Sequence, residues 1–265
     1  MFAFVDPSLT KPMSAYLDLY LADPWWGHAL QVVPFLAALG ERTGLPFWGD
    51  NFERELLHHL VWSLDQWSAF RNKGTHAEQR AALEAGLPQL IGSIQQAAPA
   101  ACLADVPEER LQSFTSAVVD ALRAFAGHEE ASFVLPSKTA HLLLPTLVPA
   151  YDGAVVVDQV LSRLFPARTR DAKTYATWLS LCWWVLQLFR REGTLAAARG
   201  QVFKSLMDDW RVRVLDAAKP TATSFVASCL DSYLAEYTLI GMYHDVKRRA
   251  GKDWRQWSPL VSYSD

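Results

Sequence analysis

The feature that most constrains the fold is the helical spacing of apolar residues along the chain. Within residues 51–70 they recur every three or four positions, at Leu56, Leu57, Leu60, Val61, Leu64 and Trp67. This spacing gives a helix one apolar face that it must bury. No stretch alternates in polarity for long enough to build a sheet, and only residues 132–135 read as a short extended piece. The sequence therefore predicts an all-α fold.

Start and stop signals bound several further helices. Asp105 followed by Pro107 predicts an N-cap for a helix that runs to about Phe125 and stops at Gly127. The other long helices expected are 169–191 ended by Gly193, 194–218 stopped by Pro220, and 224–249 ending before Gly251.

The composition is that of a folded globular protein. Of 265 residues, 51% are hydrophobic and 20% are charged, which is enough apolar material for a substantial core. We expect a compact multi-helix unit of two packed halves, residues 1–127 and 128–265. The segment 128–149, with an acidic pair and three prolines, is the expected boundary between them.

The sequence favours a cytoplasmic location. The first ten residues contain Asp6 and Pro7 and lack the basic start of a secretory signal. Cys102, Cys182 and Cys229 are odd in number and widely separated, so we expect buried thiols, with neither a metal site nor a cofactor. The net charge of −3 gives no general attraction to nucleic acid, although local basic clusters exist near the chain end.

Residues 137–152 concentrate chemically useful side chains. Ser137 reads as the cap of a two-turn helix that carries Lys138 and His141 three residues apart, on one face. Pro145 and Pro149 then stiffen the chain and deliver Asp152 to the start of the next helix.

Each of these residues also has an ordinary structural interpretation. Asp152 can be a helix N-cap, Lys138 a solvated first-turn residue, and His141 a core or surface imidazole. The combination is more informative, because a short helix and a double-proline turn fix a cation and a carboxylate relative to each other.

The pattern S-K-x-x-H-h-h-x-P-x-h-h-P-x-x-D-x-x-V over residues 137–155, where h is apolar, resembles the helix-hairpin-helix DNA glycosylases of the 8-oxoguanine type. In that superfamily a helix leaves the hairpin, a proline-bearing turn follows, and a catalytic aspartate begins the next helix. Asp152 matches that aspartate. Two departures are visible: residues 133–136 replace the glycine-rich hairpin, and Lys138 lies about one turn later than the Schiff-base lysine of the bifunctional enzymes.

The resemblance implies an enzyme that excises a modified or damaged base from double-stranded DNA and leaves an abasic site. Asp152 would stabilise positive charge on the deoxyribose. Lys138 would be a second catalytic residue, either an amine nucleophile or a phosphate contact. The flipped base would need a pocket, for which the candidate lining residues are His141, Tyr151, Trp178, Trp183 and Trp184.

Core packing is the alternative for the three tryptophans, since leucines share their helix. The departure from the standard hairpin favours a role in defence against phage DNA with modified bases over housekeeping repair.

Two other functions compete with the glycosylase. Arg71 to His76 fits the R-N-x-x-x-H pattern of HEPN-type ribonucleases, in which arginine and histidine act on the RNA phosphodiester. Alternatively, the protein is a non-catalytic helical interaction module, in which Trp25, Trp26 and Trp48 form either a partner surface or a membrane-adjacent patch.

Overall fold

The structure is a computed structural model and describes part of the chain. The described residues are 2–4, 11–22, 60, 61, 64, 76–126, 133–152, 156, 160, 161, 172–209, 231–250 and 261–263.

The described part is built from helices and one small pair of strands. The α-helices are α1 (Met13–Ala22), α4 (His76–Ala97), α5 (Glu108–Ala126), α6 (Val134–Leu143), α8 (Ala172–Arg191), α9 (Leu195–Asp209) and α11 (Asp231–Ala250). A 3₁₀ turn, η1 (Leu103–Asp105), precedes α5, and β1 (Phe2–Phe4) pairs antiparallel with β2 (Val261–Tyr263). The predicted all-α class is confirmed at this level.

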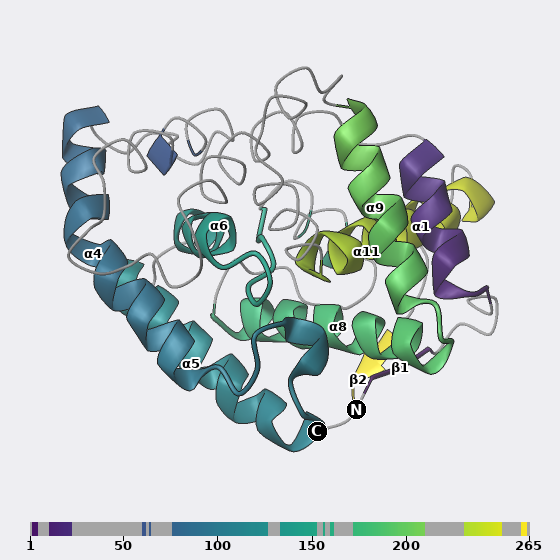
Figure 1. Cartoon of the computed structure of the whole chain (residues 1–265), viewed down its shortest axis with the longest axis horizontal. Coiled ribbons are helices and arrows are strands. Elements are labelled where there is room, and N and C mark those ends of the chain that lie inside the picture. Colours follow the sequence, from purple (N-terminus) through teal and green to yellow (C-terminus); the bar gives the residue numbers. More distant parts are fainter. Residues whose placement is uncertain are drawn as a thin grey trace.

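Helix α8 runs across the middle of the molecule (Figure 1). Its residues Trp178, Leu181, Cys182, Val185 and Leu186 are fully buried, because α1, α5, α9, α11 and η1 all pack against it. On one flank α4 lies along α5, and on the other α1 and α9 pack against α11 (Figure 1). No helix among the described residues is both long enough and apolar enough to cross a bilayer.

The predicted helix ends agree best with the structure where a glycine marks them. Gly193 has a φ of +69°, and Thr194 N–H donates to Phe189 O at 3.0 Å, which closes a Schellman motif after α8. Helix α5 ends at Ala126, beside the predicted stop at Gly127. The predicted helices 51–70, 194–218 and 224–249 lie partly outside the described residues, which retain α9, α11 and the buried Leu60 and Leu64.

Three local predictions are wrong. Asp105 does not cap α5; it lies in η1 and its carboxylate pairs with Arg190. Of the piece expected to be extended, 132–135, the last two residues instead belong to α6, which begins at Val134. Ser137 is therefore inside that helix rather than at its cap, and its hydroxyl donates to Val134 O at 3.1 Å. The division into halves at residue 127 stays a prediction.

The contact between α1 and α11 depends on a glycine. A Cβ on Gly241 would lie 1.8 Å from Tyr16 O, so only glycine lets the two backbones approach this closely. The rings of Tyr20 and Tyr237 stack beside this point, with centroids 4.2 Å apart.

We predict that Gly241→Ala separates α1 from α11 and lowers the free energy of unfolding by at least about 3 kcal/mol, the upper range for overpacking. Gly200→Ala is the matched control, because nothing lies within 4 Å of its Cβ position on α9. It should raise stability by roughly 0.5–1 kcal/mol, since alanine favours helix. Urea unfolding compares the two variants, and similar effects would contradict the close approach.

Candidate functional site

The site is organised by a loop that is buried along its length. Residues Leu144 to Tyr151 leave the end of α6 and all of them are buried, although loops normally run over the surface. A buried backbone must satisfy its polar groups within the protein. Three bonds are local: Leu144 N–H donates to Ala140 O at 2.7 Å, and the N–H groups of Leu147 and Val148 both donate to Leu144 O, at 3.0 Å and 2.9 Å.

Other segments supply partners for the first half of the loop. The hydroxyl of Ser232, on α11, donates to Pro145 O. The N–H of Leu103, in η1, donates to Thr146 O at 2.7 Å. The loop is thereby joined to two elements that are distant in sequence.

Side chains from three helices hold the second half. His141 Nδ1, from α6, donates to Val148 O at 2.8 Å. Ala150 is bonded at both of its backbone polar groups. The Nε1–H of Trp178 (α8) donates to the Ala150 carbonyl at 2.7 Å, and the Ala150 N–H donates to Oε1 of Glu236 (α11) at 2.6 Å. The Tyr175 hydroxyl, also from α8, donates to Pro149 O at 3.4 Å. The backbone leading to Asp152 is therefore fixed by tertiary contacts.

At the end of this loop, Lys138 and Asp152 form an ion pair. Lys138 Nζ lies 2.7 Å from Asp152 Oδ2, and the side chains are 2% and 18% exposed. The alternative of a solvated Lys138 is thus wrong, because α6 buries its ammonium against the carboxylate. Val156 N–H donates to Asp152 O at 2.9 Å. The helix predicted to begin at Asp152 falls on residues 153–155, which lie outside the described part of the chain.

His141 is a core histidine beside this pair. Its ring is fully buried and packs edge-on against Tyr233, with centroids 4.9 Å apart. Because Nδ1 donates to Val148 O, the proton of a neutral ring is on Nδ1. The histidine orients the loop next to Asp152.

Glu236 is a site residue that the sequence analysis missed. It is buried among the groups just described, 3.9 Å from His141 Nδ1. Burial raises the pKa of its carboxyl to about 8 against the opposing effect of the Ala150 N–H, and the charge of Asp152 adds to the rise. A signal was present: on a helical wheel Glu236 shares a face with Tyr233 and Ile240, and an acidic residue on an apolar face calls for a partner.

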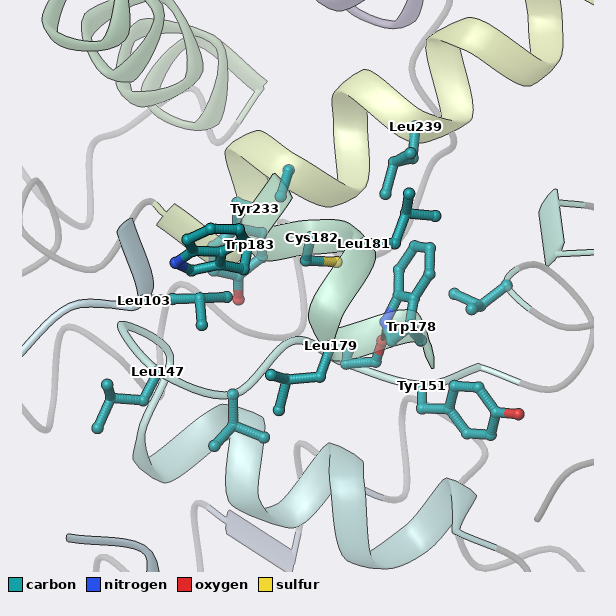
Figure 2. Close-up of a cluster of buried hydrophobic side chains, with 14 of the residues drawn as sticks. Leu103, Leu147, Tyr151, Trp178, Leu179, Leu181, Cys182, Trp183, Tyr233 and Leu239 are labelled. Atoms are coloured by element: carbon teal, nitrogen blue, oxygen red, sulfur yellow. Dashed lines mark hydrogen bonds between the residues drawn. The ribbon is translucent and has the colours of Figure 1, made fainter. Parts of the chain in front are cut away.

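The predicted pocket aromatics separate into two groups. Figure 2 shows Trp178 and Tyr151 at one side of the buried cluster, and Trp183 with Leu103 at the other. Trp183 donates its Nε1–H to Val106 O at 2.8 Å, away from the loop. Trp184 is buried as well, so the structure places all four rings in the core and their role in a base pocket stays a prediction.

The remaining candidates fall mostly outside the described residues. Arg71 and the tryptophans Trp25, Trp26 and Trp48 lie there, while His76 is the first residue of α4. Among the residues that the structure describes, no group of three His, Cys, Asp or Glu side chains could hold a metal ion. No family model matches the chain, and neither does any curated protein or solved structure.

The unequal burial of the ion pair gives a prediction about stability. Asp152→Asn leaves a buried ammonium without its carboxylate, whereas Lys138→Met leaves a carboxylate that reaches solvent. We expect Asp152→Asn to cost about 3–5 kcal/mol in the free energy of unfolding and Lys138→Met clearly less. The double variant should recover much of the loss, because it leaves no unpaired charge. Urea unfolding of all four proteins measures this, and additive effects would contradict the ion pair.

Glu236 gives a prediction about pH. Its folded pKa of about 8 lies above its usual value of 4.5, so between these values the folded protein holds a proton that the unfolded chain releases. The contribution of this proton to the free energy of unfolding is therefore full below about pH 4.5 and is lost as pH rises toward 8, a total of a few kcal/mol.

Glu236→Gln keeps an acceptor and removes the titration. The stability of this variant relative to wild type should rise steadily between pH 5 and pH 8, as measured by urea unfolding at several pH values. Glu108→Gln, at an exposed position on α5, is the control and should show no such rise. A constant difference between Glu236→Gln and wild type would show that Glu236 is ionised in the fold.

Proposed function

We propose that the protein is an enzyme that excises a modified or damaged base from double-stranded DNA and leaves an abasic site. The observation that carries the proposal is the Lys138–Asp152 ion pair, held at the end of a buried proline loop with its carboxylate partly open to solvent. The resemblance of residues 137–155 to helix-hairpin-helix glycosylases supports the same assignment.

Asp152 suits the chemistry of the N-glycosidic bond. As the bond between C1′ and the base breaks, positive charge develops on the deoxyribose, and a fixed carboxylate nearby stabilises it. A water molecule oriented by Asp152 adds its oxygen to C1′, and the base leaves with a proton. The fixed loop keeps the carboxylate in place, so little reorganisation is needed during the reaction.

Lys138 is assigned a positioning role. A nucleophilic amine needs a free electron pair, and the ammonium of Lys138 is engaged with Asp152 Oδ2 and is almost fully buried. We therefore propose that the enzyme hydrolyses the bond without a Schiff base, so that the DNA strand stays intact after excision.

The DNA contacts differ from those of the family's hairpin. Val134 to Pro136, which stand where the glycine-rich hairpin is expected, form the first turn of α6. Backbone phosphates would then be bound by other elements of this chain. A role against phage DNA with modified bases remains part of the proposal.

The test incubates the purified protein with duplexes and phage genomic DNA that carry normal, oxidised, alkylated, hydroxymethylated or glucosylated bases. Abasic sites are scored by alkaline cleavage. We expect excision of one class of base, with strand breaks only after alkali and no borohydride-trapped adduct. Asp152→Asn should lower the rate at least about 100-fold, a typical loss when a preorganised electrostatic contact is removed.

Two controls separate chemistry from folding. Asp120→Asn, an exposed carboxylate on α5, should retain full activity. The double variant Lys138→Met/Asp152→Asn, with no unpaired buried charge, should be folded and inactive. Excision that survives in the double variant would contradict the role of Asp152. Intact DNA together with RNA cleavage that is lost in His76→Ala would instead identify a ribonuclease.

A further inference from the structure

The peptide groups around Ala150 are held from both sides, two residues before Asp152. Glu236 Oε1 accepts the N–H of Ala150 at 2.6 Å, and Trp178 Nε1 donates to its carbonyl at 2.7 Å. Both side chains are buried, and they come from different helices, α11 and α8. A shift of Glu236 therefore passes directly to the backbone that carries the proposed catalytic carboxylate.

We propose that Glu236 is a positioning residue for Asp152. As an uncharged acid, Glu236 holds the backbone that leads to the Asp152 carboxylate. This inference rests on the proposed function, because it concerns the same site and gives it a dependence on pH.

The surroundings of Glu236 explain why it carries a proton. Within the described part of the chain, the titratable groups that face it are His141 from α6, Tyr175 and Cys182 from α8, and Asp152 from the loop. Burial is the main cause that raises the pKa values of the Tyr175 hydroxyl and the Cys182 thiol, and Glu236 adds to both rises, after Cys182 in the case of Tyr175. The ammonium of Lys138 is bound to Asp152. Two carboxylates thus share one region, and the buried one remains neutral.

Ionisation of Glu236 would disturb this arrangement. A second negative charge would repel the carboxylate of Asp152 and would favour opening of the contact between α11 and the loop, because a buried anion is poorly solvated. The position of Asp152 would then be lost as the pH rises. Glutamine keeps the acceptor without the charge, whereas leucine fills the space and leaves the Ala150 N–H without an acceptor from this side chain.

The first experiment needs no substrate. Protein labelled with ¹⁵N-alanine reports the Ala150 amide, assigned by its loss in Ala150→Gly, over pH 6 to 9.5. We expect this amide to shift with a midpoint near 8 in wild type and not at all in Glu236→Gln.

Charge coupling predicts opposite shifts for the two partners of the ion pair. Asp152→Asn should lower the midpoint and Lys138→Met should raise it, each by on the order of one pH unit. Asp120→Asn should leave the midpoint unchanged. An Ala150 amide that does not titrate, or shifts of one sign in both variants, would overturn the inference.

The second experiment measures base excision across the same pH range. Glu236→Gln should keep kcat at pH 7 within about threefold of wild type and should abolish the alkaline fall in activity. Glu236→Leu should lower kcat at least tenfold with KM for DNA unchanged, because Glu236 acts through the backbone. An alkaline fall that persists in Glu236→Gln, or wild-type kcat in Glu236→Leu, would overturn the inference.

The two proposals fail in distinguishable ways. If wild type excises no base but the Ala150 amide titrates with the expected opposite shifts, the glycosylase function has failed and the coupling of Glu236 to Asp152 stands. If wild type excises a base and the amide does not titrate, the role of Glu236 alone is wrong.

Discussion

The structure around the site depends on one requirement, which is that a loop buried from Leu144 to Tyr151 must have its backbone polar groups paired. An unpaired buried peptide group costs about 1–3 kcal/mol, so several of them would offset much of the stability of a domain. Groups from η1, α6, α8 and α11 supply hydrogen-bond partners to this loop. Because each element supplies at least one hydrogen bond, their packing around the loop is mutually determined. The two prolines reduce the demand, since neither Pro145 nor Pro149 has an N–H to satisfy.

This arrangement explains how the ion pair can be rigid while it is partly open. Surface pairs between flexible side chains contribute little, because ordering both partners costs conformational entropy. Here Lys138 is immobilised within α6, which is buried from Pro136 to Leu143, and Asp152 follows a backbone that is already fixed. The entropic cost has been met by folding, and the carboxylate needs no further ordering to act. A preorganised charge of this kind is the physical basis of the proposed stabilisation of a sugar cation.

Local signals in the sequence predicted what is local in the structure. Gly193 marked the end of α8 because a left-handed residue ends a helix within one turn. Lys138 and Asp152 were predicted to be held together because short elements connect them. The start of α6 was missed because Phe133 and Val134 favour strands locally and packing overrides that preference. Glu236 was missed because its partner, the Ala150 N–H, lies 86 residues away in the chain.

The roles of the aromatic residues also depend on contacts with distant parts of the chain. Trp178 and Trp183 were expected to line a pocket for a flipped base, yet both are buried donors, each with its Nε1–H on a carbonyl of an irregular segment. The ring of Trp178 is thereby part of the scaffold that fixes the loop, whereas Trp183 holds the segment before α5. Within residues 144–152 the only charged side chain is Asp152, and it is also the only one of the nine that is not buried. Any reaction that uses this loop must therefore meet solvent and substrate at that carboxylate, whose position the surrounding hydrogen bonds maintain.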